Sequence, residues 1–502
     1  MMASDRRCSV SSLPLIPFST VSYVQRAEEN DEHDEEAADH LSALPDDILL
    51  NILERLRLRP ALQTSILSRR WRRLPLQLSR LVIDVSEFMR QSPAGSRTVP
   101  RLMASYAEAA RRLLLAPAVK PKVLSLVFYL AVAEDPSHLR SIGQAVGNAA
   151  VAAEFVGLEL LPELSGSDCS GEHSALYGQR FMSLLDDCPG AFGCLTFLKL
   201  CGLRFAESDL PRVLSTCHSL QELRLHNCGD SNNVLRVDAP PSSQLVTLKI
   251  FRCHFARVEL IGVPRLARLY LHSWLCPSSP PLHLGHVPQL RYVWLASVLL
   301  SFQEPFTLSQ WLSNARNLST VCLNFRDNMV WIRPEDPKLL RPVLGNLKDL
   351  YLNDIFYGCD LDWTLSFLEA APSLNSFHVN ISWHACFRDD QVFRATPAEK
   401  TNVAGEVRNF KHRNLEFLEI GGFNAEVTTM ITFTRLVMER AVNLKRIRLH
   451  GMERCKHCDL LDGNQNPSPT RWPSLPGNED ERKLVREQLI RGFSSSIQIM
   501  ME

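Results

Sequence analysis

Two short stretches of the sequence have residue types and spacing that could support chemistry. The first is the C-x-x-C pair Cys455 and Cys458, with His450 upstream, because two thiolates at this spacing can chelate zinc. A structural zinc site needs four ligands, and no second pair lies nearby in the sequence, so we expect a turn with free thiols and no bound metal. The second is SILSRRWRRLP at 65–75, where four arginines surround one tryptophan, as they could on a nucleic-acid-binding helix.

Motifs that carry catalysis do not occur in the sequence. It has no phosphate-binding G-x-x-x-x-G-K-[ST] loop, no G-x-G-x-x-G after a strand, no H-E-x-x-H and no G-x-S-x-G. Serine, histidine and aspartate are plentiful, but nothing in the sequence pairs them. We therefore expect a protein that is not an enzyme and needs no cofactor.

The overall composition narrows the choice of partners. Lysine plus arginine and aspartate plus glutamate are equal at 55 each, which removes any global electrostatic case for binding nucleic acid or a membrane surface. No apolar run approaches the roughly 18 residues of a membrane helix. The 14 cysteines are scattered through apolar stretches rather than framing short loops. We read most as buried thiols in a reducing compartment, cytoplasmic and/or nuclear.

The region from residue 39 to 80 predicts three short helices. LPDDILLNILERL at 44–56 has apolar residues at helical spacing, with Pro45 suited to the first turn and two aspartates suited to the positive end of the helix dipole. A second helical piece follows Pro60, and Ser68 can cap a third that carries Trp71. So small a unit buries little surface, and we expect it to share its core with a partner.

Beyond about residue 120 the phrase L-x-x-L-x-L recurs. It starts at residues 195, 220, 245, 266, 290, 318, 347, 374, 415 and 444. All but one of the spacings lie near the length of a leucine-rich repeat, in which stacked short strands point alternate residues into a continuous core. Strand-like segments near 78, 123 and 155 predict earlier, degenerate repeats. The array is irregular, because only Cys228 and Cys253 fall at the Asn/Cys position of the repeat consensus.

The segments between these phrases predict what covers the strands. Most phrases are preceded by apolar residues at helical spacing, as in DLPRVLSTCHSL and DWTLSFLEAAPSL, so we expect a helix before each of those strands. Between about 230 and 290 the sequences VLRVDAPP, ARVELIGVP and LHLGHVP predict extended segments instead. Residues 388–414 are a polar excursion that predicts a surface loop. The tail predicts a helix at EDERKLVREQLIR, a stop at Gly492 and a last strand, SSIQIMM.

The segment LPDDILLNILERLRLRPALQTSILSRRWRRL resembles an F-box, the helical module that docks onto a Skp-type adaptor of a cullin-RING ubiquitin ligase. The LPDDIL and S-x-L-S-x-x-W motifs carry this resemblance. It implies that the apolar stripe faces the adaptor or a core shared with it, that Trp71 is a binding hot spot, and that the arginines form a solvated rim rather than a nucleic-acid site. The implied partner-binding residues are Leu44, Pro45, Ile48, Leu49, Ile52, Leu53, Leu67 and Trp71.

The rest of the chain resembles the plant F-box proteins with leucine-rich repeats and a C-terminal FBD region. The FBD resemblance rests on LEFLEIGGFNAEVTTMITFTRLVMERAVNLKRIRLHG, CKHC and ERKLVREQLIRGFSSSIQI. It implies an α/β chain with a three-helix F-box at 39–80, an irregular repeat solenoid at 81–404 and an FBD-like strand-helix-strand cap at 405–502. The acidic head at 1–38 has almost nothing to bury, which predicts that it is disordered.

The function implied by this family is recognition of a target protein for ubiquitination. The F-box would bind the Skp-type adaptor and through it the cullin-RING ligase, and the repeats would bind a target that the sequence does not identify, with no nucleic acid or membrane involved. Two alternatives remain open: an interaction scaffold outside any ligase, and a solenoid whose target binding needs a small molecule.

Overall fold

The computed structural model describes residues 41, 43–89, 99–115, 120–131, 136–150, 153–164, 169–230, 232, 234–274, 282–297, 305–328, 330–383, 409–452, 475–493 and 497–502. The chain forms two compact units, Met1–Leu49 and Leu50–Glu502, and helix α1 crosses the boundary between them. The predicted acidic head, most of the polar excursion at 388–414 and the pair Cys455/Cys458 lie outside the described residues.

The region that resembles an F-box begins with two α-helices. They are α1 (Asp46–Leu53) and α2 (Leu58–Gln63), followed by the 3-10 turns η1 (Thr64–Ile66) and η2 (Leu74–Gln77). The predicted third helix carrying Trp71 is wrong: residues 69–73 form a turn. Ser68 does cap this turn, its Oγ accepting from the Trp71 amide at 3.3 Å. An α-helix could not continue unbroken through this turn, because Pro75 has no N–H to donate to the Trp71 carbonyl four residues earlier.

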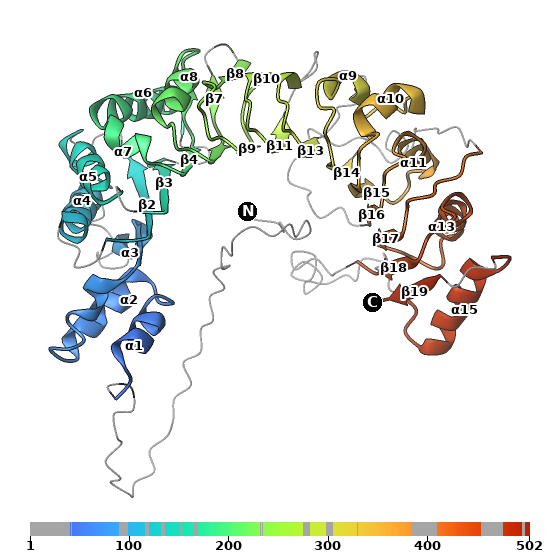
Figure 1. Cartoon of the computed structure of the whole chain (residues 1–502), viewed down its shortest axis with the longest axis horizontal. Helices are drawn as coiled ribbons and strands as arrows, with labels where there is room; N and C mark the ends of the chain where they lie inside the picture. Colours follow the sequence, from blue (N-terminus) through green and yellow to red (C-terminus); the bar gives the residue numbers. More distant parts are fainter. Residues whose placement is uncertain are drawn as a thin grey trace, which may run out of the picture. The chain divides into compact units, whose positions relative to one another are not determined.

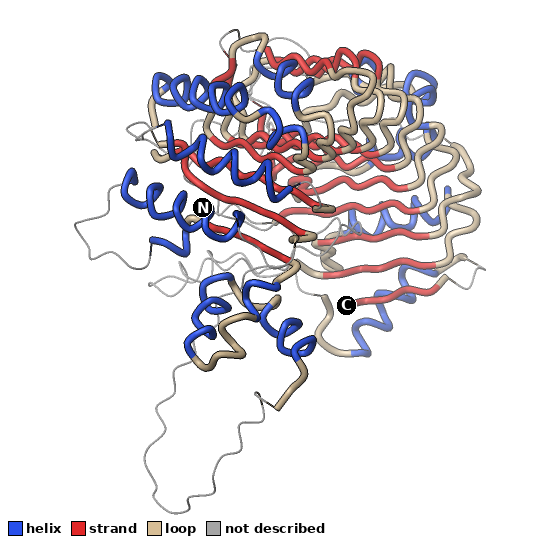
Figure 2. Tube along the Cα trace, turned by 60° about the vertical axis from the view of Figure 1, so that its left-hand side comes forward, coloured by secondary structure: helices blue, strands red, loops and turns tan. Residues whose placement is uncertain are grey.

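One parallel sheet of 14 strands runs through Leu50–Glu502, and Figure 2 shows its strands side by side. All ten L-x-x-L-x-L phrases form strands in this sheet, and so do the three earlier segments and the described end of the last predicted strand, Gln498–Met501. In sheet order the strands are β1 (Arg80–Asp84), β2 (Val123–Leu130), β3 (Phe155–Pro162), β4 (Phe197–Cys201), β6 (Glu222–His226), β9 (Thr247–Phe251), β11 (Arg268–Trp274), β13 (Tyr292–Ser297), β14 (Thr320–Asn328), β15 (Asp349–Phe356), β16 (Ser376–Ser382), β17 (Phe417–Gly421), β18 (Arg446–His450) and β19 (Gln498–Met501).

Burial alternates along most of these strands, as it does over the whole of β2, so alternate side chains enter one apolar core. The helices cover that face, and Figure 1 shows them on one side of the strands. They are α3 (Ser86–Met89), α4 (Val99–Leu115), α5 (Pro136–Ala149), α6 (Gly171–Asp187), α7 (Pro189–Gly193), α8 (Asp209–Thr216), α9 (Leu308–Trp311), α10 (Pro337–Leu344), η5 (Asp362–Thr364), α11 (Leu365–Ala370), α13 (Thr428–Arg440) and α15 (Glu479–Ile490).

Strands replace the helices in the middle of the array, as the sequence predicts for 230–290. A second parallel sheet has the order β12 (Leu282–His286), β10 (Arg257–Gly262) and β8 (Val234–Asp238). A two-stranded sheet pairs β5 (Arg204–Phe205) with β7 (Gly229–Asp230). These segments alternate apolar and polar residues with period two and end at Pro or Gly, which suits a strand and not a helix.

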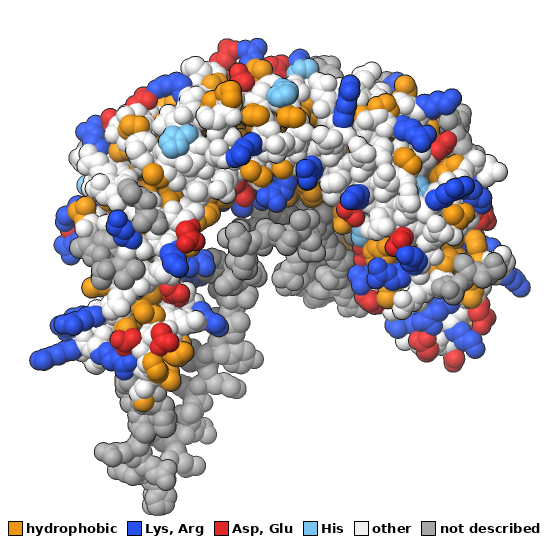
Figure 3. All heavy atoms as spheres, in the orientation of Figure 1, with side chains coloured by type: hydrophobic (Ala, Val, Ile, Leu, Met, Phe, Trp, Pro, Cys, Tyr) orange, Lys and Arg blue, Asp and Glu red, His pale blue; other side chains and the backbone are white. Residues whose placement is uncertain are grey.

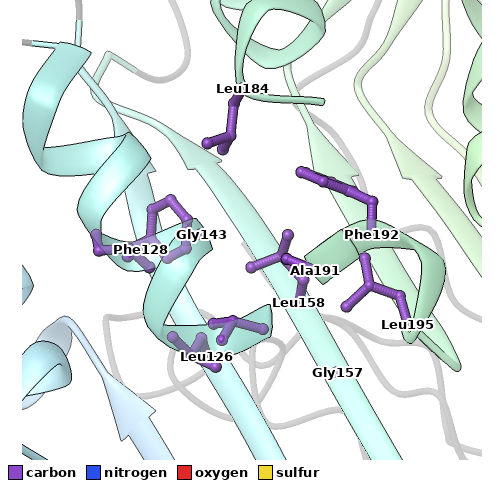
Figure 4. Close-up of a pocket in the computed structure, with 11 residues that line it drawn as sticks. Leu126, Phe128, Gly143, Gly157, Leu158, Leu184, Ala191, Phe192 and Leu195 are labelled. Carbon is purple, nitrogen blue, oxygen red and sulfur yellow. The ribbon is translucent and has the colours of Figure 1, made fainter. Parts of the chain in front are cut away.

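The core contains a small apolar cavity of about 20 Å³ between β2, β3, α5 and α7. Figure 4 shows Leu126, Phe128, Leu158 and Ala191 pointing into it, and Gly143 of α5 lies at its wall. A space lined only by apolar groups and no larger than a water or a methyl group offers no ligand site. It is a packing defect whose filling affects stability.

The C-terminal part of the chain continues the same sheet. Strand β17, helix α13 and strand β18 form one repeat-like unit, and α15 and β19 add another, with β18 and β19 paired in parallel. Helix α15 is capped by Asn478, whose side chain accepts from the Glu481 amide, and it ends before Gly492, whose φ is +88°. The positive φ explains why glycine stops this helix.

Candidate functional site

Three of the predicted partner-binding residues are buried within the chain itself. The exposed fractions of Leu49, Leu53 and Trp71 are 0%, 1% and 5%, so these side chains support the F-box region from inside and offer almost no surface to a partner. Trp71 in particular lies in the core, where its large side chain contributes to folding.

The other predicted residues reach the surface to different degrees. Ile48 and Ile52 lie one turn apart on α1 and expose 44% and 37% of their surface, although both are apolar. Leu67 exposes 65%. Pro45 is also exposed and Leu44 is half-buried. Helix α1 therefore has one apolar face turned inward and a second apolar edge turned to solvent.

Four further exposed apolar residues of the F-box region were not among the predicted ones. Leu41 exposes 55%, Leu56 exposes 44%, Ile66 exposes 84% and Leu76 exposes 46% of its surface. The sequence did contain a signal for Ile66 and Leu56. Ile66 and Leu67 are adjacent in a short turn, and neighbouring side chains there cannot both reach one core. Leu56 continues the spacing of Ile48 and Ile52 by four more residues.

Exposed arginines lie next to this apolar surface. Arg69, Arg70, Arg72 and Arg73 are all exposed around the buried Trp71. Figure 3 shows hydrophobic side chains over the helical region that Figure 1 labels α1 and α2, flanked by basic and acidic ones. The arrangement is that of an apolar patch with a charged rim, which is the usual anatomy of a protein–protein interface.

Hydrogen bonds fix α2 and the end of α1 to the first strand and helix of the solenoid. The Glu54 carboxylate accepts from the Ser79 amide at 3.0 Å and from its hydroxyl, immediately before β1. The Arg59 amide donates to the Glu87 carboxylate at 2.8 Å, which joins α2 to α3. Leu58 of α2 packs against the main apolar core. Within Leu50–Glu502 the F-box segments and the solenoid therefore share one folded body.

Metal and thiol chemistry finds no support in the part of the chain that the structure describes. No group of three or more His, Cys, Asp or Glu side chains there could hold a metal ion. Seven of the nine cysteines in those ranges are buried, which agrees with the predicted buried thiols. Burial raises the pKa of Cys201 and of Cys217 to about 12, so both remain protonated and unreactive. Among the described helices none is long and apolar enough to span a bilayer.

Two protein-family models match the chain. The F-box domain model matches residues 41–81, and the model described as "At1g61320/AtMIF1, LRR domain" matches residues 187–472, more than half of the sequence. Together they define an F-box protein of the leucine-rich-repeat type. The chain belongs to the At1g61320/AtMIF1 leucine-rich-repeat domain family, which confirms the predicted fold class and the predicted resemblance.

Similar proteins occur in plants. The F-box/FBD/LRR-repeat protein At5g56420 of Arabidopsis thaliana is 28% identical over 47% of this chain and 56% of its own length. The FBD-associated F-box protein At4g10400 of Arabidopsis thaliana is 26% identical over 50% of this chain and 61% of its own length. The matched part thus spans about six tenths of these relatives. A solved structure titled "Crystal structure of TLR13-ssRNA13 complex" is 16% identical with a TM-score of 0.32, over 66% of this chain and 51% of that one, and bears on neither function nor ligand.

Proposed function

We propose that this protein is the substrate-recognition subunit of a cullin-RING ubiquitin ligase of the SCF type, acting in the cytoplasm or nucleus. Its F-box region binds the Skp-type adaptor, and its solenoid binds the protein to be ubiquitinated. Catalysis belongs to other subunits. The observation that carries the proposal is the exposed apolar surface of the F-box region, above all Ile66 and Leu67, which the protein's own core leaves uncovered.

Burying an exposed large apolar side chain in a partner stabilises the complex, by about 1.5–3 kcal/mol for each side chain that becomes fully buried. The arginine rim around them adds charged groups that fix orientation more than affinity. The adaptor is therefore expected to contact Ile48, Ile52, Ile66 and Leu67, with Leu49, Leu53 and Trp71 holding the surface in place. The partner-binding residues predicted from the sequence thus divide into two groups: some contact the adaptor, and others support that surface from inside.

The connection between the F-box segments and the solenoid supports a positioning role. Within Leu50–Glu502, the Glu54–Ser79 hydrogen bond joins Glu54 to the residue before β1, and the Arg59–Glu87 hydrogen bond joins α2 to α3. A target held on the solenoid is then kept at a fixed distance from the adaptor. A rigid spacing brings target lysines repeatedly to the same place, which raises their effective concentration at the ligase.

The test is recovery of the Skp-type adaptor with the full-length protein. The variant Ile66→Asp with Leu67→Asp places two charges where the adaptor would bury apolar groups, and we expect it to lose the adaptor. The matched control is Leu339→Asp with Leu484→Asp, because these leucines on α10 and α15 are also largely exposed, at 60% and 59%, and lie outside the F-box region. Equal recovery with both variants would rule out this surface as the adaptor site.

An interaction scaffold outside any ligase is the second candidate, favoured only by the size of the solenoid surface. In that case the Ile66→Asp/Leu67→Asp variant would retain its cellular partners and the lifetime of none of them would change.

A further inference from the structure

Five side chains on the face of the main sheet opposite the helices form one row across adjacent strands. We call it the cation–aromatic row: Lys199, Arg224, Lys249, Tyr270 and Trp294. The parallel register places each beside the next, from β4 through β6, β9 and β11 to β13. All five are half-buried, so part of each side chain reaches the surface. Figure 3 shows basic and hydrophobic side chains gathered along this part of the molecule.

Three like charges stand next to one another at the β4 end of the row. Neighbouring strands are about 4.8 Å apart, and like charges directly opposite each other destabilise a sheet. Two carboxylates offset them in part: Glu159 pairs with Lys199, and Glu222 lies 2.5 Å from Arg224 and 3.1 Å from Lys249.

The neighbouring side chains add further positive charge. Burial lowers the pKa of Lys249, and the positive charges of Arg224 and of Arg268 on β11 lower it further. Glu222 opposes this shift. Burial is also the main reason that the pKa of His272 falls to about 4, and nearby arginines, Arg252 among them, contribute. The site is therefore electropositive beyond what its two carboxylates offset.

The backbone of Arg252 has a left-handed conformation that recurs at equivalent positions of the array. It ends β9 with φ at +51°, and it donates its amide to the His272 carbonyl at 3.0 Å. This left-handed conformation costs a residue with a Cβ about 1 kcal/mol or more, and the equivalent position is Gly202 after β4 and Asn227 after β6. The side chain of Arg252 is exposed and adds a positive charge near His272.

The β13 end of the row is aromatic. The Tyr270 and Trp294 ring centroids are 6.3 Å apart, and the Trp294 ring stacks on His272 at 5.3 Å and 3°. Lys249 links the two ends, since its ammonium lies 4.9 Å from the centre of the Tyr270 ring. Rigid aromatic groups beside fixed cations are enriched in energetically dominant parts of interfaces.

We propose that the cation–aromatic row binds an extended acidic segment of the target protein, with Asp or Glu side chains over Lys199, Arg224 and Lys249 and an apolar side chain against Tyr270 and Trp294. This deepens the proposed function and rests on it. Arg224 and Trp294 are three strand spacings apart, or about 14 Å, which an extended peptide spans in about four residues. The segment therefore carries its carboxylates about four residues from the apolar anchor.

A single-stranded RNA fits the row less well than such a peptide. Glu159 and Glu222 are interleaved with the cations and would repel a continuous phosphate backbone. The Trp294 ring is stacked on His272, so one of its faces is not open to a base. The chain as a whole has no net charge.

The experiment measures binding of fluorescent peptides of about a dozen residues to the full-length protein by anisotropy. The probe has two glutamates and a leucine four residues further on in a glycine–serine background. Matched probes replace the glutamates by glutamine or phosphoserine, or the leucine by alanine. We expect Arg224→Glu with Lys249→Glu, and separately Trp294→Ala, to weaken binding of the glutamate–leucine probe roughly tenfold or more. The control Lys338→Glu with Arg341→Glu makes the same charge change on α10 and leaves binding unchanged.

Several results would overturn the proposal: no binding of the glutamate–leucine probe to the wild type at about 1 mM, equal binding of the glutamine probe, binding of the phosphoserine probe alone, or displacement by an oligouridine RNA. Adaptor recovery from the same preparations separates the two claims. Peptide binding without adaptor binding would refute the ligase role and leave the cation–aromatic row standing, and the converse would refute only the row.

Discussion

Substitutions at Trp71 and at the Ile66–Leu67 pair should both reduce adaptor binding, but for different physical reasons. Trp71 is 5% exposed, so Trp71→Ala removes a large core side chain and should lower the free energy of unfolding by about 3–5 kcal/mol. Ile66 and Leu67 are 84% and 65% exposed, so Ile66→Ala with Leu67→Ala should change that free energy by about 0.5 kcal/mol or less.

The intrinsic affinity for the adaptor should depend on Ile66 and Leu67 more than on Trp71. Burying the exposed parts of Ile66 and Leu67 in the adaptor is worth about 2–4 kcal/mol when about 1.5–3 kcal/mol per side chain is scaled by exposure. Losing it weakens the affinity by roughly 30- to 700-fold at unchanged stability. Trp71→Ala should instead bind through whatever fraction remains folded, and excess adaptor should restore its melting temperature by mass action.

The assays are thermal and chemical denaturation for stability and calorimetric titration for adaptor affinity, with hydrogen exchange of the α2 amides reporting local unfolding. The reasoning is refuted if Trp71→Ala keeps the wild-type stability and α2 protection yet loses the adaptor, because Trp71 would then contact the partner directly. It is equally refuted if the Ile66/Leu67 variant unfolds as readily as Trp71→Ala.

Three further predictions concern the solenoid. Gly147→Ala in α5 should stabilise the protein by about 0.5–1 kcal/mol, because its Cβ would meet Ala191 at 3.5–3.8 Å, whereas Gly143→Ala should destabilise it, because its Cβ would lie 2.5 Å from the Cys188 sulfur; denaturation curves distinguish them. The pKa of His272 is about 4 in the folded chain against an ordinary 6.5, so the unfolded chain binds more protons between these values. The free energy of unfolding should therefore fall by up to about 3 kcal/mol as the pH drops from 6.5 to 4, and His272→Gln should remove that part of the fall. Arg252→Gly should relieve the left-handed backbone strain and raise the melting temperature, while weakening binding of the acidic peptide probe measured by anisotropy.

The repeat architecture could be predicted from the sequence because its signal is local. In LTFLKL the buried positions of β4 include Leu198 and Leu200, two residues apart, and the same alternation recurs in each phrase. The replacement of helices by strands between 230 and 290 was equally readable from period-two segments ending at Pro or Gly. Both predictions use only neighbouring residues, so long-range packing had little chance to overturn them.

The F-box region was predicted less well because some of its apolar side chains enter the core and others remain exposed to solvent. Ile52 and Leu53 are both apolar and adjacent, yet one is 37% exposed and the other 1%. Helical spacing identifies an apolar stripe wider than the protein's own core can cover, but it does not say which edge stays open. The turn at Trp71 is hard to predict because Ser68 gives a good cap signal, whereas Pro75, seven residues after it, prevents an unbroken helix.

The cation–aromatic row could have been found in the sequence only by comparing repeats with one another. Its members are the single residues between the last two apolar positions of successive phrases, as in LTFLKL, LQELRL, LVTLKI, LARLYL and LRYVWL. They lie 21 to 25 residues apart along the chain, and their adjacency depends on every intervening segment keeping the strands in register. No single phrase contains that information.

The same geometry separates recognition from stability at neighbouring residues. In β9, Leu248 and Ile250 are fully buried, and truncating either to alanine should cost about 2–5 kcal/mol. Lys249 between them is half-buried on the opposite face, where a substitution changes the unfolding free energy by far less. A repeat strand can thus present a different side chain to the target without disturbing its core. Under the proposed binding to the cation–aromatic row, the identity of the target would depend on the intervening residues, whereas the leucines that identify the family would carry no information about it.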